Sequence, residues 1–172
     1  MFKWLFGKKD DAAVPGGTPD IIVIQRRVMA TPDRAFAVFV DEMNSWWPRD
    51  LTWAKDNLDT IGIEAQLGGH AFERDRSGKT ATWGTVLSMK RPEHMVFAWQ
   101  IRADRSPEPS EAAASRVDLR FVPVDAETTD VLVVHRDFPR HGEGWQAYKA
   151  SMASKGGWPR LIEAYARAAG AT

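Results

Sequence analysis

Three polar side chains could carry acid–base chemistry in this sequence: Glu73, His135 and His141. A carboxylate on a strand that faces an apolar cavity can exchange a proton with a ligand hydroxyl or carbonyl, with a histidine as partner. Alternation along the strand also supports a purely structural interpretation, because it places Glu73 with Ala71 and opposite Phe72. If Phe72 faces inward, Glu73 is solvated or paired with an arginine. We therefore predict no catalytic site, and Glu73 and His135 are the candidates if one exists.

The sequence gives little support for a nucleophilic, metal or phosphate-binding site. The chain has no cysteine, which excludes disulfides, thiolate nucleophiles and zinc–cysteine sites, and it has no Gly-x-Ser-x-Gly elbow. No two of its four histidines have the i, i+4 spacing of a helical metal site, so we predict no metal. The segment 77–80, Ser-Gly-Lys-Thr, imitates the end of a phosphate-binding loop, but Glu73 stands where the motif requires its first glycine. We interpret this segment as a hairpin turn and expect no cofactor.

The elements that must position these residues can be predicted from periodicity. Residues 21–29 have the β-branched composition of a strand, and alternating runs predict further strands at 60–66, 70–76, 80–89, 94–102, 116–123 and 129–138. Thr31 as N-cap and Pro32 as first residue predict a helix after the first strand. Trp158, Leu161 and Ile162 begin an apolar stripe of helical spacing near the C-terminus. This order predicts an α+β fold in which a curved antiparallel sheet wraps round the last helix.

The same patterns predict a lined pocket. Phe97, Trp99 and Ile101 share one face of a strand, and the chain contains eight tryptophans, each with a large apolar surface and an N–H that needs a partner. We expect a cavity of roughly 300 to 1,000 Å³, with a mouth that the loop after Arg102 could close. The predicted ligand-binding residues are Trp46, Trp47, Trp53, Phe72, Trp83, Phe97, Trp99, Phe121, His135, Trp158 and Ile162, with the first three at the mouth.

Composition limits the other possibilities. The 172 residues include 23 basic and 23 acidic side chains, so no net charge favours binding to nucleic acid. No run approaches the roughly 20 apolar residues of a membrane-spanning helix, and we expect a soluble, cytoplasmic protein. We predict a flexible tail over residues 1–19 and a single domain over 20–170. The tip of the tail, with Phe2, Trp4, Leu5 and Phe6, could contact a membrane surface or a protein partner; the oligomeric state stays open.

Several short motifs, taken together in this order, resemble the START-like (SRPBCC) superfamily and, within it, the branch named after the activator of the heat shock protein 90 ATPase. The resemblance covers roughly residues 20–168. Its motifs are Trp46-Trp47-Pro48, Gly68-Gly69, Phe72-Glu73-Arg74, Trp83-Gly84 with Val86, Ala98-Trp99-Gln100, His135 with Phe138, and Gly157-Trp158. One departure is Asp137, which stands where branch members often have a glycine.

The resemblance implies a helix-grip fold, in which the sheet and the C-terminal helix enclose an apolar cavity, often for a lipid or a polyketide-like molecule. It does not imply one activity. Our first hypothesis is binding of a small, largely apolar ligand without catalysis. The alternatives are a cyclase- or hydrolase-type enzyme that uses Glu73 and His135, and a co-chaperone-like protein-interaction module.

Overall fold

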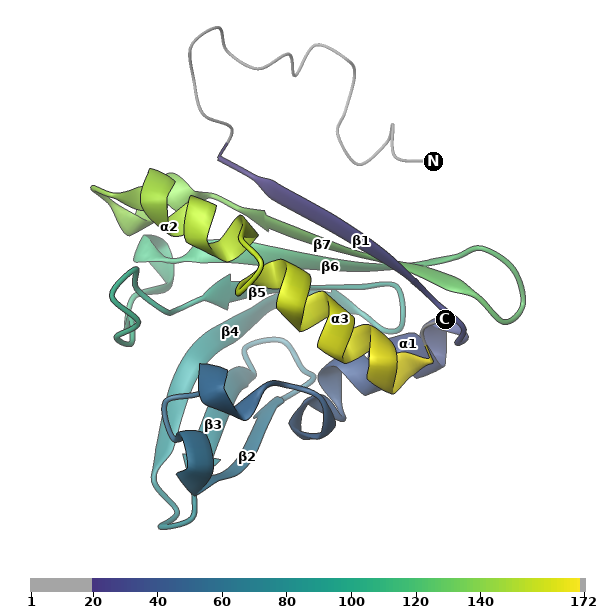
Figure 1. Cartoon of the computed structure of the whole chain (residues 1–172), viewed down its shortest axis with the longest axis horizontal. Coiled ribbons are helices and arrows are strands. Elements are labelled where there is room, and N and C mark those ends of the chain that lie inside the picture. The colour runs from purple at the N-terminus through teal and green to yellow at the C-terminus, as the bar shows by residue number, and fades with distance from the viewer. Residues whose placement is uncertain (1–19, 171–172) are drawn as a thin grey trace, which may run out of the picture.

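The computed structural model describes residues 20–170. The predicted tail, including Phe2, Trp4, Leu5 and Phe6, lies outside the described residues. The elements follow the order strand, helix, six strands and two helices (Figure 1). This is the predicted order, and the fold is the α+β helix-grip fold that the sequence indicated.

One antiparallel sheet holds all seven strands, in the order β1-β7-β6-β5-β4-β3-β2. The sheet curves, and the last helix lies across it (Figure 1). β1 pairs with β7, so the beginning of the described chain lies beside its last strand. The strands are β1 Ile22–Val28, β2 Leu58–Ile63, β3 His70–Asp75, β4 Thr80–Lys90, β5 His94–Trp99, β6 Ser115–Pro123 and β7 Thr129–Arg136.

α1 and α3 begin where the sequence signals predict. α1 spans Pro32–Val40, and the Thr31 side chain accepts a hydrogen bond from the backbone N–H of Arg34 at 3.2 Å, as an N-cap residue does. α2 spans Trp145–Ala153 and α3 spans Trp158–Ala169. Short 3₁₀ turns at 43–45, 49–51 and 55–57 connect α1 to β2, and two more lie at 111–113 and 138–141.

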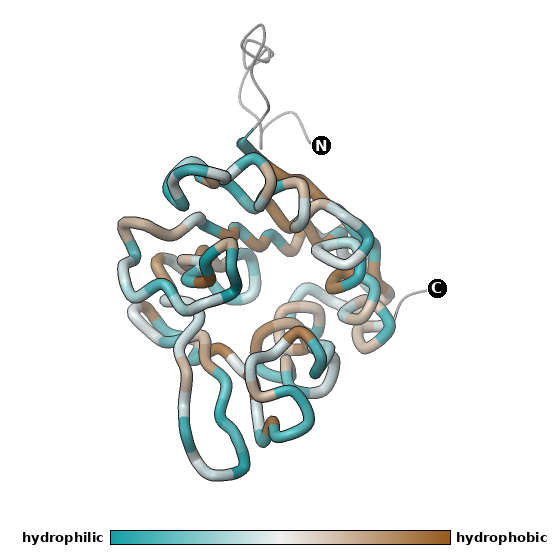
Figure 2. The backbone as a smooth tube through the Cα atoms, turned by 60° about the vertical axis from the view of Figure 1, so that its left-hand side comes forward, coloured by the Kyte–Doolittle hydropathy of each residue, from teal (hydrophilic) through white to brown (hydrophobic). Residues whose placement is uncertain are grey.

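The predicted apolar stripe of α3 is buried against the sheet and α1. Trp158, Leu161, Ile162 and Tyr165 are each at most 3% exposed. The Tyr165 hydroxyl donates a 2.9 Å hydrogen bond to the carbonyl of Ala35, which ties α3 to α1. In Figure 2 hydrophobic stretches run along the strands, and hydrophilic stretches lie at turns and loop tips. The core therefore lies between the sheet and these two helices.

β3, β4 and β5 approach one another closely at Gly84. This residue is paired with Trp99 of β5. A Cβ atom at position 84 would lie 2.6 Å from the carbonyl oxygen of Ala98 and 3.0 Å from the Cβ of Ala71. Only glycine lets the three strands come this close without a clash.

Candidate functional site

Two adjoining cavities lie between the end of β5, the loop that follows it and α2, and the first of them extends to α3. They share Trp99 at the end of β5, Ile101 and Arg105 in the following loop, and Ser151 and Met152 of α2. Their volumes are about 180 Å³ and 280 Å³, so each is smaller than the predicted cavity. The first also contacts Trp47, Leu51, Ser154, Gly156, Gly157 and Leu161, and the second contacts Ala103, Gly144, Ala147 and Tyr148.

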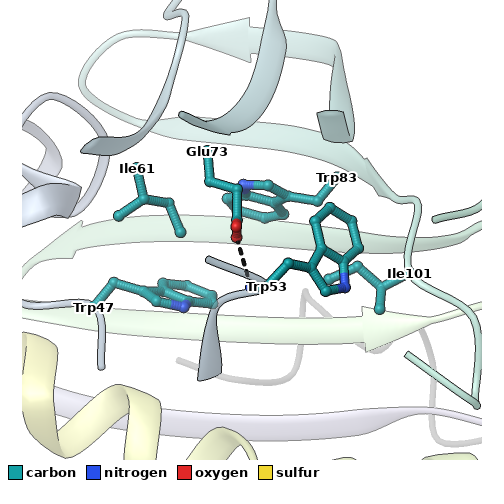
Figure 3. Close-up of a pocket in the computed structure, with 6 residues that line it drawn as sticks. All are labelled: Trp47, Trp53, Ile61, Glu73, Trp83 and Ile101. Carbon is teal, nitrogen blue, oxygen red and sulfur yellow. Dashed lines mark hydrogen bonds between the residues drawn. The ribbon is translucent and has the colours of Figure 1, made fainter. Parts of the chain in front are cut away.

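A third, much smaller pocket lies next to the first cavity and has a volume of about 20 Å³. Trp47 and Ile101 line both. The pocket is completed by Trp53, Ile61, Glu73 and Trp83. In Figure 3 the Glu73 side chain points toward the backbone at Trp53, with aromatic rings around it. It is therefore an apolar pocket with one carboxylate.

Glu73 faces inward, which corrects the expected orientation of this strand. Ala71 and Glu73 are buried, whereas Phe72 lies on the opposite face and is half-buried. The Phe72 ring occupies the space next to Gly62, its partner in β2, where no side chain competes for that space. The interpretation that Phe72 faces the interior is therefore wrong. The expectation that Glu73 is solvated or paired with an arginine is wrong for the same reason.

The Glu73 carboxylate holds the segment that covers the small pocket. Its two oxygens accept hydrogen bonds from the backbone N–H groups of Trp53, at 3.0 Å, and Ala54, at 2.7 Å. The indole of Trp53 in turn donates a 2.6 Å hydrogen bond to the carbonyl of Arg105, and the Arg105 guanidinium donates at 3.1 Å to the carbonyl of Leu51. The loop after Arg102 is thus fastened to the segment between α1 and β2.

Tyr148 joins α2 to the wall of the cavities. Its hydroxyl accepts a 2.8 Å hydrogen bond from the Trp99 indole and donates a 2.6 Å bond to the carbonyl of Ile101. Burial raises the pKa of Tyr148 to about 12, so the hydroxyl stays protonated and keeps both bonds at neutral pH. These bonds hold Trp99 and Ile101, which line both larger cavities, in fixed positions.

His135 is fully buried in a chain of hydrogen bonds. The Trp158 indole, which can only donate, is 2.9 Å from its Nδ1, so the ring proton lies on Nε2 and is donated to the Ser115 hydroxyl at 2.7 Å. That hydroxyl then donates to His141 Nε2, also at 2.7 Å. Burial lowers the pKa of His135 well below 6.5, and the nearby His141 lowers it further. Burial also lowers the pKa of His141, although Glu108 opposes this change.

Glu73 and His135 do not form an acid–base pair around a common space. None of the three cavities described above is lined by both, and His135 lines none of them. Both imidazole nitrogens of His135 already have partners, and the depressed pKa keeps the ring neutral. Such a histidine serves the structure by connecting Trp158 to Ser115.

The structure divides the predicted ligand-binding residues into two groups. Trp47, Trp53, Trp83 and Trp99 line at least one of the three cavities. The other inward-facing predictions are packed in the core and line none of these three: Trp46, Phe97, Phe121, His135, Trp158 and Ile162. The His135 and Trp158 rings contact each other, and Phe39 packs against both Trp46 and Phe121.

Most of the cavity residues on α2 and in the loop after Arg102 were not predicted from the sequence. Ser151 and Met152 line both larger cavities, as does Arg105. The signal for Ile101 was present, because it follows Trp99 at the strand spacing of two residues. Arg105 carried no signal beyond its place in the loop after Arg102, and its backbone adopts a left-handed φ of 71°.

The backbone conformation at Asp137 accounts for the occurrence of aspartate where the motif often has glycine. It has φ 64° and ψ 31°, the left-handed conformation that favours glycine and that Asp and Asn tolerate better than other residues. Its carboxylate also accepts a 2.9 Å hydrogen bond from Arg136. The backbone conformation at this position is therefore one that either glycine or aspartate can adopt.

Two further findings concern metal binding and membrane spans within residues 20–170. No group of three or more His, Asp or Glu side chains in this range is arranged to hold a metal ion. Among the helices of the same range, none is long and apolar enough to cross a membrane.

A curved antiparallel sheet that grips a C-terminal helix defines a helix-grip protein. Residues 29–168 match the family model described as activator of Hsp90 ATPase homolog 1-like protein, and the chain belongs to this family. A comparison with curated proteins gives no match.

Solved structures with the same fold differ in their described roles. An anthrahydroquino-γ-pyrone synthase, Txn09, is 24% identical with a TM-score of 0.62, over 90% of this chain and 99% of that chain. The self-sacrificing resistance protein CalC from Micromonospora echinospora is 23% identical with a TM-score of 0.59, over 87% and 92%. An HSP90 activator from Plasmodium falciparum is 16% identical with a TM-score of 0.54, over 83% and 91%. These similarities establish the fold alone.

Proposed function

We propose that residues 20–170 act as one domain that binds a small, largely apolar molecule, without catalysis, in the two larger cavities. The observation that carries this proposal is their position between the end of β5, the loop that follows it and α2, where Trp99, Ile101 and Met152 supply apolar walls to both. Ligand sites are commonly concave spaces with mostly apolar walls and a few polar groups. Here Arg105 and Ser151 are the polar groups that both cavities share.

Catalysis by Glu73 and His135 has less support, because these residues have separate partners and His135 is sealed in the core. Txn09 is named as an anthrahydroquino-γ-pyrone synthase, which makes fused-ring aromatic polyketides reasonable probes. The co-chaperone-like alternative rests on the family name and on the Plasmodium activator. No surface feature of the described residues favours it over ligand binding.

A blocking substitution in α2 tests the proposal. Ser151 lines both cavities and is exposed, so Ser151→Trp would place an indole in the binding space at little cost to the core. Ala150→Trp is the matched control, because Ala150 is exposed on the same helix and lines neither cavity. The probes are palmitate, cholesterol and an anthraquinone, measured by native mass spectrometry and calorimetry.

We expect the wild type and Ala150→Trp to retain at least one probe, and Ser151→Trp to lose it by tenfold or more, equivalent to about 1.4 kcal/mol. Absence of binding by all three proteins, or equal binding by both variants, would contradict the proposal.

A further inference from the structure

The indole N–H of Trp83 has no hydrogen-bond partner among residues 20–170, although the side chain is only 2% exposed. Three other buried indoles of the chain have acceptors: Trp46 donates to a carbonyl at 2.8 Å, Trp99 to the Tyr148 hydroxyl at 2.8 Å, and Trp158 to His135 at 2.9 Å. A buried donor without an acceptor is unfavourable, because it has lost its hydrogen bond to water and gained none in the protein. Such a group calls for a specific explanation.

Trp83 lines the small pocket, which also contains the Glu73 carboxylate. Each carboxylate oxygen of Glu73 already accepts one backbone N–H, and a carboxylate has about four acceptor sites in total. Two residues that line the pocket thus have hydrogen-bonding capacity left, Trp83 as a donor and Glu73 as an acceptor, among walls that are otherwise apolar. Its volume of about 20 Å³ is enough for one water-sized group, which needs about 10–15 Å³.

We propose that this pocket recognises the hydroxyl group of a ligand whose apolar body lies in the adjoining cavity. A hydroxyl oxygen can accept the Trp83 N–H while its proton is donated to Glu73. A ketone or ether satisfies only Trp83, an ammonium group only Glu73, and a carboxylate is repelled by Glu73. The ligand class is therefore an apolar alcohol or phenol.

The position of the pocket fits this class. Trp47 and Ile101 line both the small pocket and the first larger cavity, so the two spaces are adjacent. A flat ring system in the larger cavity could direct one hydroxyl past Trp47 toward Glu73 and Trp83. This inference rests on the proposed function, because it concerns the polar end of the same site.

The test compares three probes that share one ring system: naphthalene, β-naphthol and β-naphthoate, each titrated into the full chain at neutral pH by calorimetry. We expect β-naphthol to bind at least tenfold more tightly than naphthalene, and β-naphthoate to bind most weakly. In ¹H–¹⁵N spectra, β-naphthol should shift the Trp83 indole signal, which is assigned by its absence in Trp83→Phe.

Two variants separate the hydroxyl contact from general effects. Trp83→Phe removes the donor and keeps an aromatic ring, so we expect it to lose the tenfold preference for β-naphthol over naphthalene. Trp145→Phe is the control, because it also removes one indole but lines none of the three cavities. It should keep the preference. If Trp83→Phe does not fold, the order of the three probe affinities for the wild-type protein still tests the hydroxyl site.

The outcomes distinguish this inference from the proposed function. Equal binding of naphthalene and β-naphthol, or a preference that survives Trp83→Phe, overturns the hydroxyl site and leaves the binding function intact. The same holds if the Trp83 signal does not move on binding. If none of the three probes and none of the earlier lipid or anthraquinone probes binds, both proposals fail.

Discussion

The buried His135 predicts a specific loss of stability in mild acid. Its pKa in the folded protein is well below 6.5, first because burial disfavours the charged ring and second because His141 lies nearby. In the unfolded chain the imidazole regains an ordinary pKa near 6.5. Below that pH the unfolded chain takes up a proton that the folded protein does not, so folding becomes less favourable as the pH falls.

The magnitude follows from this linkage. Each pH unit below 6.5 costs about 1.4 kcal/mol as long as His135 stays neutral in the folded protein. Between about pH 8 and about pH 5 the loss from this one group is about 2 kcal/mol. His141 shifts in the same direction, but it is only half-buried and Glu108 opposes the shift, so its contribution is smaller.

Urea unfolding of the wild type and of His135→Gln over this pH range measures the effect. Glutamine does not titrate, and its amide can accept from Trp158 and donate to Ser115 as the imidazole does. We expect the variant to be less stable at pH 8 but to lose about 2 kcal/mol less than the wild type on acidification.

Thr31→Ala is the control for this experiment, because it removes the cap of α1 and no titratable group. It should lower stability by about 1 kcal/mol at every pH. If His135→Gln and the wild type instead give parallel curves of stability against pH, the explanation from burial of a neutral His135 is refuted.

Two further predictions concern the walls of the cavities. Tyr148→Phe leaves the Trp99 indole and the Ile101 carbonyl without their partner, so we expect a loss of about 1–3 kcal/mol in thermal or urea unfolding; unchanged stability would show that water replaces the hydroxyl. Gly84→Ala places a Cβ 2.6 Å from the carbonyl oxygen of Ala98; this overpacking should cost about 1–3 kcal/mol or more in the same assay, and a neutral result would mean that β4 can move away from β5.

Local sequence rules predicted the elements well. The N-cap at Thr31 and the proline after it depend only on neighbouring residues, and α1 begins there. The stripe that begins at Trp158 predicted α3 because helical periodicity places these side chains on one face wherever the helix lies. The order of these elements predicted a curved antiparallel sheet around the last helix, and the resemblance to the superfamily implied the same arrangement.

The candidate site was only partly predictable. Alternation assigns residues to two faces of a strand but does not say which face is inside. For β3 the expected orientation was reversed, and Glu73 is buried instead of Phe72. β7 carries apolar residues on both faces, so alternation cannot say which face is inside; in the structure Val131 and Val133 join the core cluster, and Leu132 and Val134 are buried outside it. Aromatic composition likewise did not separate the tryptophans that pack together from those that line a cavity.

The sequence by itself determined which segments form strands, the cap of α1 and the apolar stripe of α3, because these features depend on residues that are close together in the chain. The tertiary structure decided the rest. Ser115, His135 and His141 meet only because β6 pairs with β7 and the chain then turns back. Trp83, whose N–H has no partner among residues 20–170, likewise shares a pocket with Glu73 only because β3 and β4 pack under the segment at Trp53. Contacts of this kind join distant residues, so their geometry is set by packing of the whole domain.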